Sequence, residues 1–195
     1  MPVAKAWSTD VGVEVASLGI QVHGGAGFIE EAGAAQFYRD ARIAPIYEGT
    51  NGIQAMDLVG RKLPLAGGEP IRALFTEMRA TVSDLDKEVG AHLREAIAAT
   101  ERATEWLDPN RGSTDALAGA TTYLKLLGDT VGGWMLAKGA QAAESLEDKD
   151  YARGKLALAR LFATQVLTQA PGLAEGVMAG SEEIKEGNIA LTPID

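Results

Sequence analysis

Hydrophobic residues recur at three- and four-residue steps along most of the chain, which is the spacing of one face of an α-helix. The first stripe runs from Val3 to Val22 and ends at the glycine-rich segment Gly24–Gly27. We expect a second helix over about 32–43, closed by Pro45, and a third that Thr50 caps and that ends near residue 63. No capping residue type precedes the first stripe, so we expect the chain to be a fragment of a longer protein.

A segment rich in proline and glycine, 64–70, is the clearest predicted linker. Beyond it, amphipathic stretches predict four helices joined by short connections, which favours an up-down-up-down four-helix bundle over 71–180. Gly90 is expected to interrupt or end the first of these stretches, and Pro171 to stop the last. The polar residues 181–195 are expected to form a frayed tail.

Strand signals are scarce, and composition agrees with helix. The chain holds 33 alanines but only four Phe, four Tyr and three Trp, and alanine is the strongest helix former. The predicted fold class is therefore all-α. Three glycines of the third predicted bundle helix, Gly128, Gly132 and Gly133, predict a close helix approach within the bundle or against a second subunit.

Charge and composition exclude several classes of function. The net charge is −9 and no basic cluster is present, so we expect no nucleic-acid partner. Cysteine is absent, and neither histidine, His23 or His92, belongs to the Glu-x-x-His pair of a di-iron bundle, so no metal site is predicted. We see no transmembrane segment and no export signal, and we expect a soluble, cytoplasmic protein.

Three segments before the linker could carry chemistry. They are Gln21–Gly27, Tyr38–Arg42 and Ile46–Asn51. Taken singly, the first is most simply a helix end and turn, the second an ion-paired helix end, and the third a helix cap with Glu48 near its positive end. Alternatively, Glu48 is a base in an apolar pocket beside a helix that binds phosphate.

Together, in this order and spacing, the three segments resemble the C-terminal helical domain of the flavin-dependent acyl-CoA dehydrogenases. The run QVHGGAGFIEEAGAAQFYRDARIAPIYEGTNGIQ carries the resemblance, which extends over about the first third of the chain. The part after the linker is similar to the extra helical domain of a longer-chain branch of that family, mainly through Asp115–Leu124 and Gly132–Trp134. The resemblance thus implies three helices of the dehydrogenase domain (1–63) followed by the bundle.

The resemblance also implies roles for single residues. Glu48 matches the catalytic base that removes the α-proton of an acyl-CoA, while Tyr47 and Gly49 match residues that line the acyl site. Thr50 and Asn51, at a helix N-terminus, correspond to the binding site of the FAD pyrophosphate.

Gln21, Gly24 and Gly25 match a motif that contacts the adenosine half of an FAD held mainly by a neighbouring subunit, which implies a homo-oligomer, a dimer or a tetramer. Electron-transfer flavoprotein is the implied electron acceptor.

Two departures from the family pattern limit these expectations. Gly52 stands where many members have Glu or Gln, and the domains that carry most flavin and substrate contacts are absent, so we expect the chain alone to be inactive. A non-catalytic helical interaction module derived from the family is the alternative, and retention of Glu48 argues against it. The acyl-chain length of the substrate stays open: short, thioether-containing and long chains are all compatible with the sequence.

Overall fold

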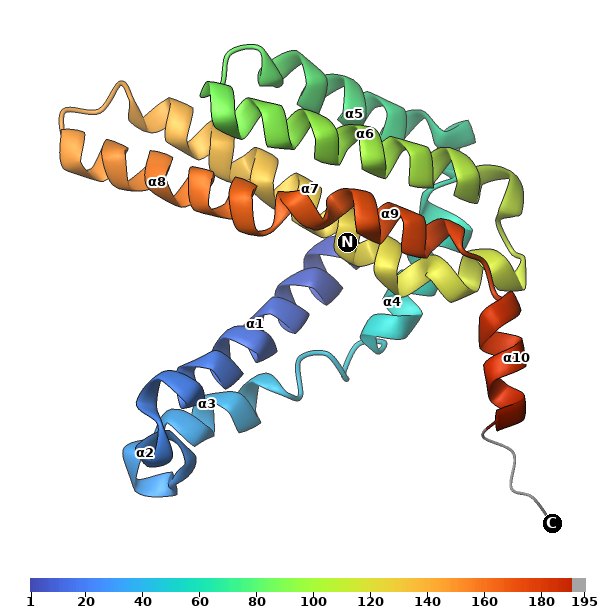
Figure 1. Ribbon diagram of the computed structural model, residues 1–195, viewed down its shortest axis with the longest axis horizontal. Coiled ribbons are helices and arrows are strands. Elements are labelled where there is room, and N and C mark those ends of the chain that lie inside the picture. Colours follow the sequence, from blue (N-terminus) through green and yellow to red (C-terminus); the bar gives the residue numbers. More distant parts are fainter. Residues whose placement is uncertain (191–195) are drawn as a thin grey trace.

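The computed structural model describes residues 1–190, which form helices joined by turns, without a strand (Figure 1). The all-α prediction is confirmed. The α-helices are, in chain order, α1 (Pro2–His23), α2 (Gly25–Phe28), α3 (Ala34–Ala41), α4 (Asn51–Asp57), α5 (Glu69–Val82), α6 (Lys87–Asn110), α7 (Thr114–Ala143), α8 (Lys149–Gln165), α9 (Ala170–Met178) and α10 (Glu182–Ala190). Short 3-10 turns lie at Glu30–Ala32, Leu65–Gly68 and Leu167–Gln169, and a π-helical turn at Leu58–Lys62 continues α4.

Helices α5, α6, α7 and the pair α8–α9 form the predicted up-down-up-down bundle (Figure 1). The long helix α7 is its centre and packs against α6, α8 and α9. Small residues line the α7 core positions, such as Ala116, Ala120, Ala137 and Ala140, and all are buried. Close packing of these alanines explains how a chain with few aromatic residues fills a core.

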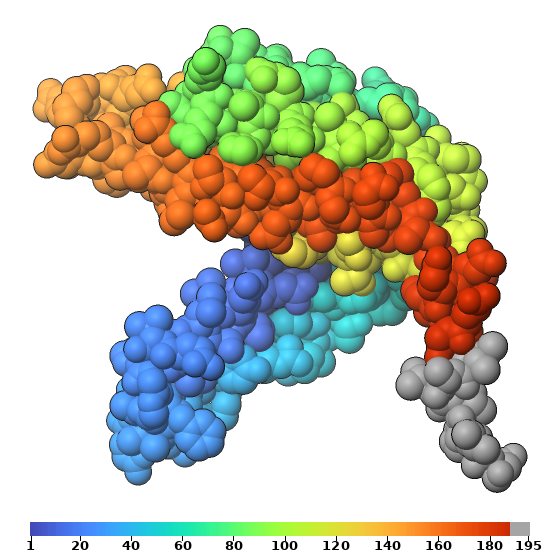
Figure 2. All heavy atoms as spheres, in the orientation of Figure 1, coloured from blue at the N-terminus to red at the C-terminus, as the bar shows by residue number. Residues whose placement is uncertain are grey.

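The first three α-helices form an arm that stands away from the bundle (Figures 1 and 2). Along its length α1 packs against α3 and α4, and its N-terminal end packs against α7. The buried core is continuous from the arm's base into the bundle, because Ala6, Ala55, Leu58 and Val59 belong to the same cluster as the bundle residues.

Trp7 fastens α1 to α7. Its ring lies against Gly128 and Gly132, where a side chain would collide with it: a Cβ on Gly132 would stand 3.0 Å from the ring. Its indole Nε1 donates a hydrogen bond of 2.8 Å to Oδ1 of Asp129, a carboxylate only 3% exposed that also accepts from Lys125 at 2.7 Å. The close approach at Gly128 and Gly132 is thus made by α1, from outside the bundle, whereas the predicted approach within the bundle occurs at Gly133, which lies against Leu167.

Two helix boundaries differ from the sequence prediction. The first bundle stretch breaks at Ser83–Asp86 and not at Gly90, which lies inside α6. Asp86 caps α6 by accepting the Val89 N–H at 3.2 Å, and a Cβ on Gly90 would stand 3.2 Å from the Val82 carbonyl oxygen. Gly90 therefore serves the tight α5–α6 corner rather than a helix end.

The second difference lies at Pro171. The last bundle stretch bends through Leu167–Gln169 after α8 ends, and Pro171 lies in the first turn of α9 instead of stopping the stretch. A proline is tolerated in the first turn of a helix, where its missing N–H has no partner to lose.

The polar segment after residue 180 forms helix α10 where we predicted a frayed tail. Asp115 anchors its start, since its Oδ1 accepts hydrogen bonds from the Ser181 N–H at 3.0 Å and from the Ser181 hydroxyl at 2.5 Å. These bonds hold the pKa of Asp115 below its usual range. Residues 191–195 of the predicted tail lie outside the described residues. Within the described range, no helix is both long and apolar enough to cross a bilayer.

Candidate functional site

The segment that carries Glu48 is a tight turn between α3 and α4. Pro45 is buried at its start, and its carbonyl oxygen accepts the Asn51 N–H at 3.0 Å, which closes the turn. Thr50 caps α4 as predicted, since its Oγ1 accepts the Ile53 N–H at 3.5 Å. The turn therefore presents Tyr47 and Glu48 just ahead of a helix N-terminus.

The backbone of the turn is strained at Glu48, which has a φ of 54°. A left-handed conformation costs a non-glycine residue about 1–2 kcal/mol, and it persists only where neighbouring groups hold it. Gln54 is one such group: its Nε2 donates to the Glu48 carbonyl oxygen at 3.0 Å. Gly49 follows with a φ of 83°, and a Cβ there would stand 3.2 Å from the same Nε2.

A second set of contacts ties the turn to α1. Lys5 Nζ donates to the Gly49 carbonyl oxygen at 3.0 Å and to Asn51 Oδ1 at 2.7 Å. The Asn51 amide nitrogen donates in turn to the Ala6 carbonyl oxygen at 3.1 Å and to Asp10 Oδ1 at 2.7 Å. The side chain of Asn51 is thus committed to α1, although the sequence associated this residue with the cofactor.

The outward face of the turn is rich in unused hydrogen-bond donors. Within residues 1–190, the backbone N–H groups of Glu48, Gly49 and Thr50 donate to no protein acceptor. The side chains of Glu48 and Tyr47 are exposed beside them, and the first turn of α4 contains no acidic residue. Such a set of amides at a helix N-terminus suits an anionic group or a developing oxyanion.

The remaining predicted site residues lie at the opposite end of the arm. Gln21, Gly24 and Gly25 are exposed at the C-terminal end of α1, where Gly24 adopts a φ of 62°. Gln21 is sixteen residues beyond Lys5, or about 24 Å along the helix. The structure therefore does not bring this group together with the Glu48 turn within one chain.

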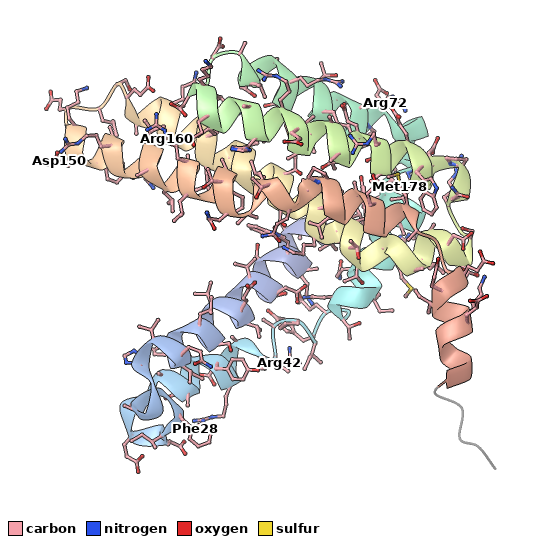
Figure 3. The ribbon with its side chains drawn as sticks, viewed as in Figure 1. Phe28, Arg42, Arg72, Asp150, Arg160 and Met178 are labelled. Carbon is pink, nitrogen blue, oxygen red and sulfur yellow. The ribbon has the colours of Figure 1, made fainter. Side chains whose placement is uncertain are left out.

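The arm exposes an unusual amount of apolar surface. Large hydrophobic side chains are open to solvent on α1, α2 and α3, and Figure 3 labels Phe28 at the outer end of the arm. The most exposed of them are Val22 at 86%, Phe28 at 81% and Phe37 at 72%. Patches of this kind normally mark an interface.

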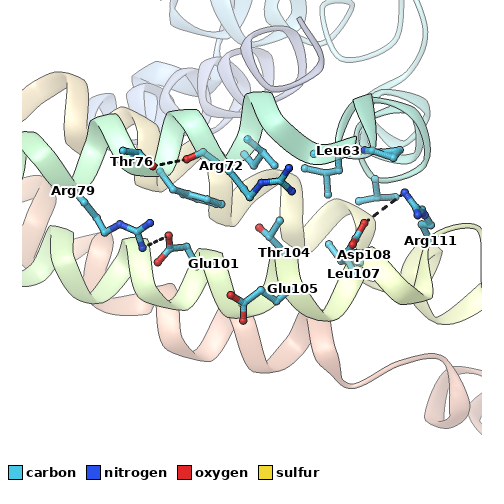
Figure 4. Close-up of a pocket in the computed structure, with 15 residues that line it drawn as sticks. Leu63, Arg72, Thr76, Arg79, Glu101, Thr104, Glu105, Leu107, Asp108 and Arg111 are labelled. Carbon is cyan, nitrogen blue, oxygen red and sulfur yellow. Dashed lines mark hydrogen bonds and ion pairs between the residues drawn. The ribbon is translucent and has the colours of Figure 1, made fainter. Parts of the chain in front are cut away.

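A separate pocket of about 440 Å³ lies between α5, α6 and the segment 59–68 that precedes α5 (Figure 4). Arg79 forms an ion pair with Glu101 on one side of it, and Arg111 lies 3.5 Å from Asp108 on the other. No residue predicted for the site lines this pocket, so it is distinct from the Glu48 turn.

Sequence reasoning missed three residues that hold the site together. Lys5 holds the turn from 44 positions away, Gln54 holds it locally from six positions away, and Asp129 holds α1 through Trp7, 122 positions away. A signal existed only for Asp129, since its carboxylate stands beside the helix glycines that were singled out.

Two family models match the chain on either side of the predicted linker. Residues 1–63 match the family described as "Acyl-CoA dehydrogenase, C-terminal domain", and residues 74–186 match "Acetyl-CoA dehydrogenase C-terminal like". The chain belongs to the acyl-CoA dehydrogenase family, as the resemblance implied.

Individual proteins with similar sequences support this family membership. The 3-methylmercaptopropionyl-CoA dehydrogenase of Ruegeria pomeroyi is 45% identical over 185 residues, which cover 87% of this chain and 31% of that protein. The caffeyl-CoA reductase-Etf complex subunit CarC of Acetobacterium woodii is 38% identical over 61 residues, 31% of this chain and 16% of that protein. The chain spans about a third of the length of the first curated relatives that it matches.

Among solved structures, an acyl-CoA dehydrogenase complexed with FAD from Bacillus anthracis has the same fold. The TM-score is 0.70 at 17% sequence identity, and the match covers 100% of this chain and 36% of that one. It confirms the fold expected from the sequence.

Proposed function

We propose that this chain is the C-terminal part of an FAD-dependent acyl-CoA dehydrogenase, and that Glu48 is its catalytic base. The observation that carries the proposal is the turn itself: an exposed carboxylate on a strained backbone, beside unused amide donors, in a chain of this family. The reaction converts an acyl-CoA to a trans-2-enoyl-CoA. Bound FAD supplies the acceptor for the β-hydride.

Glu48 removes the α-proton of the thioester. That proton is weakly acidic, so the negative charge that develops on the thioester oxygen must be stabilised as the proton leaves. The unused backbone N–H of Glu48 is suited to donate to this oxygen. Tyr47 and Gly49 line the acyl site next to it. Exclusion of water by bound substrate strengthens the base, because desolvation disfavours the charged carboxylate.

The fit of the turn to FAD rests on its donors. The N–H groups of Gly49 and Thr50 have no acceptor among residues 1–190, and a helix N-terminus free of acidic residues accommodates a pyrophosphate. We propose that Thr50 holds this group. Asn51 contributes to the same site by fixing the turn, because its side chain is already bonded to α1.

The distant Gln21, Gly24 and Gly25 serve a second FAD, held mainly by a neighbouring subunit of a homodimer or homotetramer. Their separation from Glu48 and the exposed apolar surface of the arm support this arrangement. Electron-transfer flavoprotein is the proposed electron acceptor, and the CarC relative, named as a subunit of a reductase-Etf complex, supports this. The isolated chain is inactive, because it covers only about a third of its relatives.

The test is Glu48→Gln in the longer protein, with Glu31→Gln as the matched control. Both residues are exposed glutamates near the arm, but only Glu48 lies on the turn. Glutamine keeps the shape and the backbone N–H but accepts no proton. A general base contributes about 10²–10⁴-fold, so activity should fall by at least about 100-fold while FAD content stays unchanged. Near wild-type turnover of Glu48→Gln with any acyl-CoA contradicts the proposal.

A further inference from the structure

We propose that Lys5 is a positioning residue for the site: by bonding the Gly49 carbonyl oxygen, it directs the turn's free backbone amides toward the ligand. The inference rests on the function proposed above and adds a residue from outside the three segments that the sequence pointed to. Gln54 acts in the same way on the neighbouring peptide, by donating a hydrogen bond to the Glu48 carbonyl oxygen.

The argument begins with peptide geometry. In a trans peptide the C=O and the N–H point in opposite directions. Lys5 Nζ holds the Gly49 carbonyl oxygen at 3.0 Å on the α1 side, so the Thr50 N–H of the same peptide points away from α1. Gln54 Nε2 holds the Glu48 carbonyl oxygen at 3.0 Å, so the Gly49 N–H is directed away from Gln54.

These two hydrogen bonds matter because, without them, the peptides after Glu48 and Gly49 could rotate. Gly49 has no side chain to restrict it, and its φ of 83° lies in the left-handed region. Glu48 holds a positive φ that its neighbours must maintain. Rotation of either peptide would replace an amide donor on the ligand side with a carbonyl oxygen, which repels an oxyanion or a phosphate.

Lys5 itself is rigidly placed. Its Nζ is also bonded to Asn51 Oδ1 at 2.7 Å, so the ammonium is held from two sides. Two residues on, Trp7 is docked on α7, and positions 5 and 7 lie about 200° apart around a helix. Helix α1 thus bridges the bundle and the turn, with Trp7 facing one and Lys5 the other.

The test in the longer protein compares Lys5→Met with Lys5→Arg, and uses the exposed Lys87 on α6 as the control, Lys87→Met. Methionine keeps the apolar stem and removes the donor, whereas arginine keeps donors within reach of both oxygens. Misplacement of a reacting group by about 1 Å costs about 100-fold. Because the Gly49 and Thr50 amides face the FAD pyrophosphate and Glu48 lies next to Gly49 on the same turn, we expect Lys5→Met to weaken FAD binding and to lower kcat per bound flavin at least about tenfold, with a smaller change in KM. Lys5→Arg should retain most of the rate and of the FAD affinity.

A purely structural role predicts a different result. If Lys5→Met lowers only thermal stability, and both FAD affinity and kcat per bound flavin are unchanged, the proposal is wrong. Glu48→Gln is assayed alongside, and its full activity would refute the proposed function itself rather than the part assigned to Lys5.

A measurement on the 195-residue chain alone decides the Lys5 geometry without flavin or activity. In ¹⁵N–¹H spectra, Lys5→Met should shift the Gly49 and Thr50 amide resonances, Lys5→Arg should shift them much less, and Lys87→Met should leave them in place. The spectra also report whether each variant is folded. Unmoved Gly49 and Thr50 resonances in a folded Lys5→Met chain would overturn the proposal.

Discussion

Replacing one helix glycine with alanine tests how the arm is fastened to the bundle. Gly128→Ala puts a methyl group where the Trp7 ring lies, well inside van der Waals contact. Gly139→Ala is the matched control, because it makes the same change in the same helix at a position where no described atom beyond the local helix backbone lies within 4 Å of the added Cβ.

The two substitutions should have opposite signs. Alanine in place of glycine within a helix stabilises by about 0.5–1 kcal/mol, and Gly139→Ala gains this in full. Gly128→Ala gains the same amount but pays for overpacking, about 1–3 kcal/mol. Displacing Trp7 also removes its hydrogen bond to the buried carboxylate of Asp129, which keeps its bond to Lys125. The loss of this bond lowers the free energy of unfolding by a further amount of about 1–3 kcal/mol. We expect Gly128→Ala to be less stable than Gly139→Ala by about 3 kcal/mol.

Urea unfolding followed by circular dichroism measures both variants, with tryptophan fluorescence as a second probe. The slope of free energy against urea should stay unchanged, so that the midpoint reports stability. If Gly128→Ala is as stable as Gly139→Ala, the Trp7 ring does not pack against Gly128 in solution. The described contact between α1 and α7 would then be wrong.

The 195-residue chain should purify colourless and bind FAD weakly or not at all in equilibrium dialysis, and a yellow protein with stoichiometric FAD would contradict this. In hydrogen exchange, α6 and α7 should exchange slowly and the outer half of α1 quickly, and the reverse order would be a refutation. Because the pKa of Asp115 is lowered from 3.8 by Ser181, its contribution to stability is present above about pH 4 and is lost as pH falls through the lower folded-state pKa. When stability is measured against pH, Asp115→Asn should lack this loss. Identical stability curves for Asp115→Asn and the wild-type chain would contradict the role of the Asp115–Ser181 contact.

The helices were predictable because their apolar stripes are local. The stripe from Val3 to Val22 became α1, and Thr50 caps α4 as its residue type suggested. The corner after α5 was misplaced for a physical reason. Glycine usually marks a helix end, but Gly90 is needed inside α6 for close contact with Val82, and Asp86 provides the cap.

The site was only partly predictable. The motif drew attention to Glu48, and the structure adds that the residue lies on a strained turn. The groups that hold the turn were not accessible from periodicity. Lys5 contacts a residue 44 positions away, and Trp7 contacts one 122 positions away, and no local pattern specifies such pairs.

The measurement that tests the central claim most directly is anaerobic mixing of the longer protein with a series of acyl-CoA substrates, followed by the visible absorbance of its flavin. It separates the chemistry at Glu48 from every later electron transfer. The account predicts rapid loss of the flavin absorbance with at least one acyl-CoA in the wild-type protein. It predicts a rate at least about 100-fold lower in Glu48→Gln, which should contain the same amount of FAD. Equal rates in the two proteins would contradict the assignment of Glu48 as the base.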